Sequence, residues 1–317
     1  MADIATYTSL KKPKKLFKKV TKGNMTHLPE IKMEGRSGCR LEVLKNDKRV
    51  IIKKYSSSLA YNKRLIKQAE KQQDFFNHLP AGTKFTTAPV LDIKPSKDSL
   101  AYFSMPYLFS EKYSDYLEKV SFRDIKILLQ EIITYLSHNI RKSRYELIDT
   151  ETITAKVEEL KLSIQRNIHL GDSRFLWEVI NYLEQNVPVD PLPIGMCHGD
   201  LTFSNILFSD SKIYLLDFLD SFIESPIIDI VKLRQDTCFK WSVMLEKQMP
   251  QHKKNKIIQT FDYLDGEIAQ YCNKELGMLK WYNYLQVFNL IRIFPYLDKT
   301  DEVAFIEKSL RRIIRCI

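Results

Sequence analysis

The stretch HGDLTFSNILFSDSKIYLLDFLD, residues 198–220, decides how this sequence folds. Two apolar runs, Ile206–Phe208 and Ile213–Leu216, flank a short polar turn, and this pattern predicts a β-hairpin. Asn205 stands just before the hairpin and Asp217 just after it. Because the two ends of a hairpin lie side by side, we expect these two side chains to be neighbours.

The polar side chains of this stretch suit phosphoryl transfer. An amide oxygen from Asn205 and a carboxylate from Asp217 are hard oxygen ligands for Mg²⁺, with phosphate oxygens completing the coordination shell. Asp200, at the start of the loop, is placed to accept a proton from a hydroxyl aligned with the phosphate. We therefore predict Asn205 and Asp217 as metal ligands, and Asp200 and Asn205 as catalytic residues.

The pattern His-Gly-Asp-x₄-Asn, followed by Ile-x-Leu-Leu-Asp-Phe, resembles the aminoglycoside phosphotransferase and choline kinase superfamily. Gly199 stands where protein kinases usually have arginine, and Leu219 where they have glycine, which favours the small-molecule branch. The resemblance implies an α+β, two-lobed protein-kinase-like fold, with a small N-terminal antiparallel sheet plus a helix and a large, mainly helical C-terminal lobe. It also implies Mg²⁺ and ATP as cofactors, with GTP as the alternative nucleotide, and a hydroxyl acceptor on a small molecule.

Hydrophobic periodicity predicts the remaining elements. The predicted strands lie within 31–55, at 88–94 and at 99–105, and a helix lies at 58–79. Long helices are predicted at 121–143, 151–168 and 173–186, and residues 226–317 are mainly helical. We expect a basic arm at 1–28, a nucleotide-binding lobe at 29–108 and a catalytic and substrate-binding lobe at 109–317.

The resemblance implies a lysine at the end of the third strand that holds the nucleotide phosphates and pairs with a helix glutamate. Both Lys53 and Lys54 end that strand. Side chains alternate along a strand, and the face that carries Lys54 also carries Val50 and Ile52, an apolar wall that suits an adenine pocket. This favours Lys54, while Lys53 stays open. Glu70 is the one glutamate of the following helix, and we expect it to pair with the lysine.

The resemblance also implies a hinge where the purine edge meets the backbone. Met105 ends the strand predicted at 99–105 and would be the gate residue, Pro106 would offer its carbonyl and Leu108 its N–H. The proline is compatible with its place, because that position needs no N–H. Backbone N–H groups of the loop around Ser37 could cap the phosphates, although a GxxG loop is often an ordinary turn.

Four further side chains of this region have both structural and functional interpretations. His198 is expected to hold loop backbone rather than act as the base, and Asp229 to anchor a helix to the catalytic loop. Asp220 and Glu224 could face an amine of the acceptor, but exposed carboxylates are common on any surface.

The acceptor class stays open between several chemistries. A sugar or amino alcohol used in surface-glycan or lipid-headgroup synthesis is the leading hypothesis. An aminoglycoside-type antibiotic is the first alternative, although polycationic drugs favour an acidic surface and residues 55–317 are charge-balanced. A protein kinase or nucleotidyl-transferring enzyme of the same fold is the second. A scaffold with a dead core is the third, but it should have lost a functional residue.

The formal net charge of +10 is confined to the first sixth of the chain. Residues 1–54 hold 15 basic and 5 acidic side chains, and the remainder holds 34 of each. A nucleic-acid partner is therefore not expected. Seven lysines between Lys11 and Lys22 could make a weak contact with an acidic membrane or form a solvated arm. Five scattered cysteines and no long apolar run predict a cytoplasmic protein, with its oligomeric state open.

Overall fold

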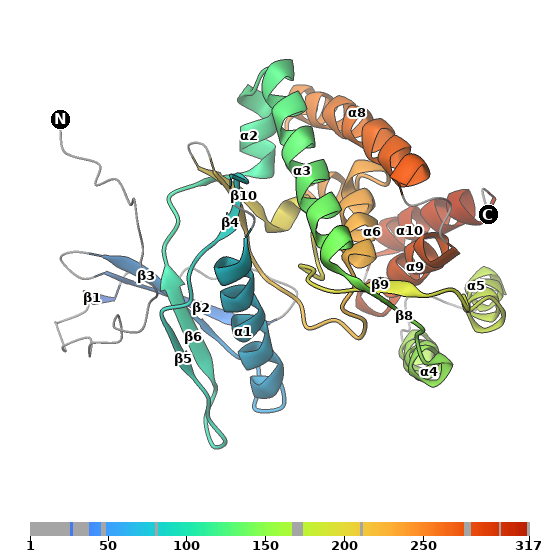
Figure 1. The fold of residues 1–317 in the computed structure, drawn as a ribbon, viewed down its shortest axis with the longest axis horizontal. Helices are drawn as coiled ribbons and strands as arrows, with labels where there is room; N and C mark the ends of the chain where they lie inside the picture. Colours follow the sequence, from blue (N-terminus) through green and yellow to red (C-terminus); the bar gives the residue numbers. More distant parts are fainter. Residues whose placement is uncertain are drawn as a thin grey trace.

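The computed structural model describes residues 26–27, 38–45, 49–79, 82–166, 174–209, 212–275, 280–297 and 299–315. Most of the strands gather at one end of the molecule and most of the helices at the other (Figure 1). The α+β, two-lobed arrangement expected from the sequence is confirmed: a small lobe with an antiparallel sheet and one helix is followed by a mainly helical lobe.

The sheet of the small lobe has the strand order β1-β2-β3-β6-β5, and all of its neighbouring strands are antiparallel. The strands are β1 (Thr26–His27), β2 (Arg40–Lys45), β3 (Val50–Tyr55), β5 (Asp92–Lys94) and β6 (Tyr102–Pro106). β2 and β3 are two of the three strands predicted within 31–55. The first predicted strand lies outside the described residues, and β1 falls at the end of the predicted arm, whose other residues up to 25 are also outside them.

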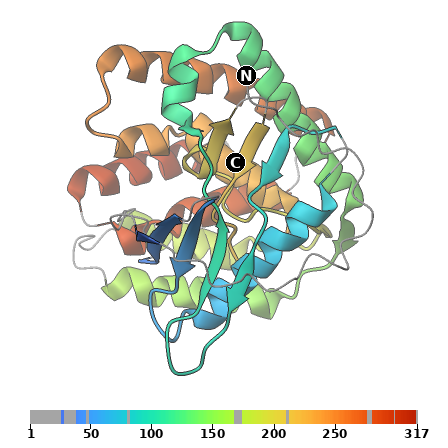
Figure 2. The ribbon, with the colours of Figure 1, turned by 90° about the vertical axis from the view of Figure 1, so that its left-hand side faces the viewer.

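Helix α1 (Asn62–His78) lies between this sheet and the helical lobe (Figures 1 and 2). Leu65 and Ala69, one turn apart, pack against Phe103 and Met105 of β6 in the small lobe's own core. The Asn62 amide fastens the start of the helix: its Nδ2 donates to two carbonyls of the loop between β5 and β6, and its Oδ1 accepts from the Ala101 N–H. The helix is thereby fixed to the sheet at one end and free to present its far face to the other lobe.

A second, four-stranded sheet sits where the lobes meet and has the order β4-β11-β10-β7. Its strands are β4 (Phe85–Thr87), β7 (Glu111–Lys112), β10 (Ile206–Ser209) and β11 (Lys212–Leu215). β4 pairs in parallel with β11, and the Thr87 hydroxyl donates to the Leu215 carbonyl at 2.8 Å. The small-lobe part of the chain therefore contributes a strand to the sheet that carries the predicted hairpin.

The predicted strand at 88–94 differs from the observed one. Residues 88–91 form no strand, and pairing resumes only at β5. The physical reason is Pro89, which has no N–H to give to a ladder and stands where the chain passes from one sheet to the other.

The helical lobe is built mainly from α-helices that follow β7. They are α2 (Tyr113–Lys119), α3 (Phe122–Lys142), α4 (Thr150–Arg166), α5 (Arg174–Gln185), α6 (Pro226–Thr237), α7 (Trp241–Leu245), α8 (Gln251–Glu275), α9 (Lys280–Ile291) and α10 (Thr300–Ile314). A short antiparallel ribbon of β8 (Arg144–Glu146) and β9 (Leu192–Ile194) and two single-turn helices, η1 (Phe203–Asn205) and η2 (Phe294–Tyr296), complete the described elements. The three helices predicted between 121 and 186 correspond to α3, α4 and α5.

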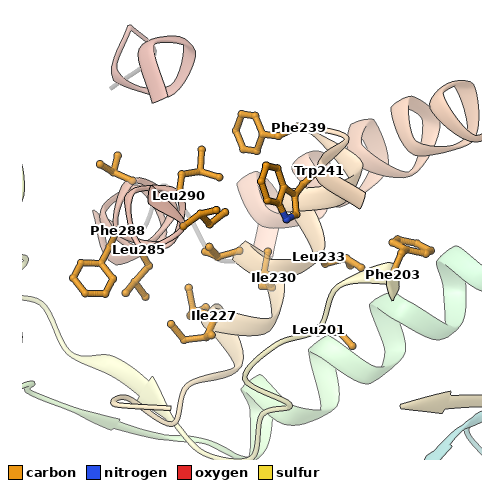
Figure 3. Packing of buried hydrophobic residues seen from close by; sticks show 14 of the residues in the cluster. Leu201, Phe203, Ile227, Ile230, Leu233, Phe239, Trp241, Leu285, Phe288 and Leu290 are labelled. Atoms are coloured by element: carbon orange, nitrogen blue, oxygen red, sulfur yellow. The ribbon is translucent and has the colours of Figure 1, made fainter. Parts of the chain in front are cut away.

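Helix α6 lies at the centre of this lobe and is buried nearly all round. Ile227, Ile230 and Leu233 project from it among side chains of α9 and of the segment that contains Leu201 and Phe203 (Figure 3). Figure 3 also shows Trp241, at the start of α7, packed beside α6. The segment that contains Leu201 and Phe203 is thus packed on a large apolar core, which fixes the position of its backbone.

Candidate active site

The loop that begins at His198 turns sharply at Gly199, whose φ is +85°. A Cβ atom at this glycine would lie 2.7 Å from the Leu219 carbonyl oxygen and 2.6 Å from Ser221 Oγ. Only glycine fits both the backbone conformation and the close approach. The turn brings the start of the loop against the segment that follows β11.

Asp200 and Asn205 are held together across this loop. Asn205 Nδ2 donates to the Asp200 carbonyl oxygen at 2.8 Å and to Asp200 Oδ2 at 2.9 Å. The Asp200 side chain is 32% exposed, so one face of the carboxylate is open to an incoming group. The predicted catalytic pair is therefore in contact.

Buried groups behind the loop fix its backbone. Asp229, in the first turn of α6, accepts from the His198 N–H at 2.7 Å, the Gly199 N–H at 2.8 Å and the Tyr135 hydroxyl at 2.9 Å. Burial raises the pKa of Asp229 to about 6, although these bonds oppose the rise. The structure thus places Asp229 as the expected anchor between helix and loop.

His198 is also structural, in line with the sequence. Its Nε2 lies 2.7 Å from the Leu216 carbonyl oxygen, and its Nδ1 accepts from the Asp200 N–H at 3.2 Å. These partners require a neutral ring with the proton on Nε2. Burial lowers the pKa of His198 to about 4, which keeps the ring neutral at physiological pH.

A second anchor, Asp236 in the last turn of α6, was not predicted from the sequence. Its carboxylate accepts from the Phe203 N–H at 2.7 Å and from the Ser242 N–H at 2.9 Å. The seven-residue spacing of Asp229 and Asp236 places both on one side of a helix, and that spacing is the signal that could have revealed the second anchor.

Asn205 and Asp217 bracket the hairpin as predicted. Ile206 is opposite Leu215, and the Leu216 N–H donates to the Asn205 carbonyl at 3.0 Å. Asp217 follows with a φ of +59°, a left-handed conformation that is uncommon outside glycine. This turn ends the strand and leaves the Asp217 side chain 58% exposed.

Lys54 reaches this carboxylate from the other lobe. Its Nζ donates to Asp217 Oδ1 at 2.7 Å, while its side chain is only 8% exposed. Burial alone would lower the pKa of Lys54, but the charge and hydrogen bond of Asp217 outweigh it and the pKa is raised. Lys53 points to the other face of β3 and lies over the Tyr102 ring, with Nζ 4.8 Å from the centroid. The structure thus places Lys54, and not Lys53, beside the predicted metal ligands.

Glu70 does not form the pair expected of it. Its side chain is exposed on α1, and within the described part of the chain the acid bonded to Lys54 is Asp217. The helix turns a lysine toward the helical lobe instead: Lys71 donates to the Leu219 carbonyl at 2.8 Å and to the Glu224 carboxylate. Distance along the chain does not by itself place a glutamate at the site, because the face of the helix that carries it decides what it meets.

The expected hinge residues lie along the edge of the small-lobe core. Met105, in β6, is buried, and Leu108 packs against the same cluster. Pro106 is opposite Ile51, and the next residue's N–H donates to the Val50 carbonyl at 3.0 Å. Ser37 lies outside the described residues, as does most of the glycine-containing loop.

Lys232, on α6, was missed by the sequence reasoning. Its Nζ lies 3.0 Å from Asp200 Oδ1, and its side chain is 13% exposed. Burial would raise the pKa of Asp200, but the charge of Lys232 and its hydrogen bond outweigh this and the pKa is lowered. Asp200 is therefore ionised at neutral pH and able to accept a hydrogen bond from a hydroxyl.

The sequence model of the Phosphotransferase enzyme family matches residues 37–256, which is more than half of the chain. The chain belongs to this family. The matched range spans both lobes and contains each of the predicted site residues. No curated protein sequence matches this phosphotransferase significantly.

Solved structures with the same fold include enzymes of this kind. A thermostable mutant of aminoglycoside phosphotransferase APH(4)-Ia, in ternary complex with AMP-PNP and hygromycin B, is 12% identical, with a TM-score of 0.58 over 92% of this chain and 93% of that chain. Choline kinase LicA from Streptococcus pneumoniae is also 12% identical, with a TM-score of 0.53 over 92% of this chain and 94% of that chain. At these identities the likeness establishes the fold of the phosphotransferase.

The phosphotransferase has no helix among its described residues that is long and apolar enough to cross a membrane.

Proposed function

We propose that this phosphotransferase transfers the γ-phosphoryl group of ATP to a hydroxyl of a small molecule. The supporting observation is the convergence of Asp200, Asn205, Asp217 and Lys54 where the two lobes meet. These residues come from four separate positions in the chain and match the parts that phosphoryl transfer needs: a hydroxyl-orienting carboxylate, metal ligands and a phosphate-binding cation.

Asn205 and Asp217 are the proposed holders of Mg²⁺. The Asn205 amide gives its N–H groups to Asp200, so its oxygen is the atom left for a metal, and no donor in the described residues is bonded to it. Asp217 follows the other end of the hairpin, is 58% exposed, and pairs with Lys54. This donor set fits a hard cation that takes its other ligands from phosphates. Bound Mg²⁺ would neutralise phosphate charge during transfer.

The remaining roles follow from position. Lys54 would bind the α- and β-phosphates, with Met105, Pro106 and Leu108 along the edge that receives the base. Asp200 would orient the acceptor hydroxyl and take its proton. The acceptor oxygen forms a bond to the γ-phosphorus as the bond from that phosphorus to the β–γ bridging oxygen breaks, and ADP leaves with the electron pair.

For the acceptor we propose a sugar or amino alcohol used in surface-glycan or lipid-headgroup synthesis. The fold neighbours are named for an aminoglycoside phosphotransferase and a choline kinase, which are enzymes for hydroxyl compounds of low molecular mass. An antibiotic acceptor is the second candidate, supported by the first of these neighbours.

The test is ADP release from ATP and Mg²⁺ by the purified chain, measured with and without a panel of polyols, sugars and amino alcohols. We expect ADP release to rise with at least one small acceptor, and the acceptor to be recovered as a phosphomonoester. Transfer of labelled phosphate to the protein alone, or of the nucleotidyl group with release of pyrophosphate, would contradict the proposal.

A further inference from the structure

The carboxylates that could bind a cationic acceptor are already paired with lysine side chains. Lys71 of α1 bonds Glu224, and Lys67, one turn earlier, lies 3.4 Å from Asp220 Oδ2. Asp200 itself is paired with Lys232. A charged amine would have to displace a lysine at each of these positions. The described surroundings of Asp200 therefore offer a cationic acceptor no free carboxylate.

The same surroundings contain a cation, Arg292, whose side chain is not paired with an acid among the described residues. Arg292, in the turn after α9, lies over two aromatic rings, with its guanidinium carbon 5.8 Å from the Phe222 centroid and 5.9 Å from the Phe288 centroid. Within the described residues its guanidinium makes no hydrogen bond or ion pair, although this group carries five N–H donors. Figure 3 shows Phe288 on the side of α9 that faces away from Leu290.

Arg292 lies beside the loop that carries Asp200, because one of the rings under its guanidinium belongs to Phe222. The residue before this ring, Ser221, packs against Gly199, which precedes Asp200. Burial lowers the pKa of Arg292, and the largest opposing effect is the negative charge of Asp200. Arg64, exposed on α1 across the junction of the lobes, adds a second positive charge, which lowers the pKa of Arg292 further. A half-buried, unpaired arginine is costly in free energy unless a ligand supplies its partner.

From these contacts we infer that Arg292 binds an anionic group of the acceptor, a carboxylate or a phosphate, close to the hydroxyl that Asp200 orients. Planar guanidinium groups suit both anions because they can donate two parallel hydrogen bonds. The acceptor is then an acidic hydroxyl compound, such as a phosphorylated or carboxylated sugar or polyol. This inference rests on the proposed function and narrows its acceptor class away from amino alcohols and polycations.

Binding and transfer are measured separately so that the two proposals can fail independently. With AMP-PNP and Mg²⁺ present, calorimetry compares each anionic probe with its neutral parent: ribitol 5-phosphate with ribitol, glycerol 3-phosphate with glycerol, and glucuronate with glucose. Choline is the cationic probe. We expect at least one anionic probe to bind tenfold or more tighter than its parent, and choline not to bind.

Substitutions of Arg292 test whether this residue is the cause of the tighter binding of anionic probes. Arg292→Gln removes the charge and is expected to lower the affinity for the preferred anionic probe at least tenfold. Arg292→Lys keeps the charge without the planar guanidinium and is expected to retain part of that affinity. Arg141→Gln, at an exposed position of α3, is the matched control and should bind as the unaltered chain does. In ADP-release assays, Arg292→Gln should raise the KM for the anionic acceptor more than it lowers kcat.

Equal affinity for anionic and neutral members of every pair, or unchanged anion binding by Arg292→Gln, overturns the inference. Phosphorylation of neutral or cationic compounds in preference to anionic ones also overturns it, while leaving the proposed phosphotransfer intact. Anion binding that depends on Arg292, with no phosphorylated product from any acceptor, supports the inference and contradicts the proposed function instead.

Discussion

Lys53 and Lys54 are neighbours in sequence with different surroundings, which allows a matched test of the nucleotide site. Lys54→Met removes the cation beside Asp217, and we expect it to lower kcat/KM for ATP by about 100-fold or more, the scale of losing one charge-stabilising group. Lys53→Met removes a cation that lies over Tyr102 and should change kcat/KM less than about threefold. Steady-state ADP release measures both.

The comparison is informative only if both variants fold, which circular dichroism and thermal unfolding can establish. A similar loss of activity in both variants would contradict the assignment of Lys54, and a larger loss in Lys53→Met would reverse it.

His198 predicts a pH dependence of stability. Its pKa falls from the ordinary 6.5 to about 4 on folding, because burial disfavours the charged ring. Between these values the unfolded chain binds more protons than the folded chain, so the contribution of His198 to stability is full above pH 6.5 and is lost as the pH falls toward 4. From pH 7 to pH 5 this loss is about 2 kcal/mol at most.

The measurement is the free energy of unfolding in urea, for the unaltered chain and for His198→Asn, at pH 7 and pH 5. The substitution should cost less at pH 5 than at pH 7, because the unaltered chain has lost part of the histidine's contribution. Asp229 and Asp236 titrate in both proteins and cancel from this difference. A cost that is the same at both pH values would contradict the neutral, buried histidine.

At the residue scale, the sequence was informative where a motif fixes both residue type and spacing. Asp200 and Asn205 are five residues apart in one loop, so local geometry brings them together. Lys232 comes from a later helix, α6, and its place beside Asp200 depends on packing that hydrophobic periodicity does not reveal. Glu70 shows the same limit, since one rotation of α1 decides whether it meets the site.

Helix α3 begins with a capping box that provides a test at the element scale. Ser121 Oγ accepts from the Asp124 N–H, and Asp124 Oδ2 accepts in return from the Ser121 N–H at 3.0 Å. Ser121→Ala removes the hydroxyl that accepts from the Asp124 N–H and donates to the Asp124 carboxylate, and it should lower the free energy of unfolding by about 1 kcal/mol.

Ser163→Ala is the control, because this serine lies inside α4 and bonds only the carbonyl one turn back. Alanine is the better residue in a helix interior, so the control should be neutral or slightly stabilising. Equal destabilisation by the two substitutions in urea unfolding would show that the cap has no special role.

Elements with local signals were predictable, and those that depend on distant partners were not. The β10–β11 hairpin and helices α3 to α5 follow from alternation and helical periodicity within short windows. β4 has three residues and pairs in parallel with β11, about 128 positions further on, so nothing in its own sequence specifies the partner. The predicted boundary between lobes at residues 108 and 109 stays a prediction.

At the scale of the whole molecule, the two lobes are connected by ionic contacts as well as by the chain. Lys54 of β3 pairs with Asp217. Two lysines of α1 pair with acids a few residues after Asp217: Lys67 with Asp220, and Lys71 with Glu224. The face of α1 that carries these two lysines therefore both holds α1 against the helical lobe and neutralises the acidic side chains near the proposed acceptor site. The charge of the lysine-rich arm has no counterpart in this arrangement, and its membrane contact stays a prediction.

The central claim is that Asp200 directs phosphoryl transfer to an acceptor hydroxyl. The most direct test is acceptor-dependent ADP release by Asp200→Asn, beside its affinity for ATP and Mg²⁺ measured by calorimetry. We predict a loss of turnover of at least about 100-fold with ATP affinity within about threefold, because the carboxylate acts on the hydroxyl and not on the nucleotide. Undiminished acceptor-dependent turnover by this variant would contradict the account.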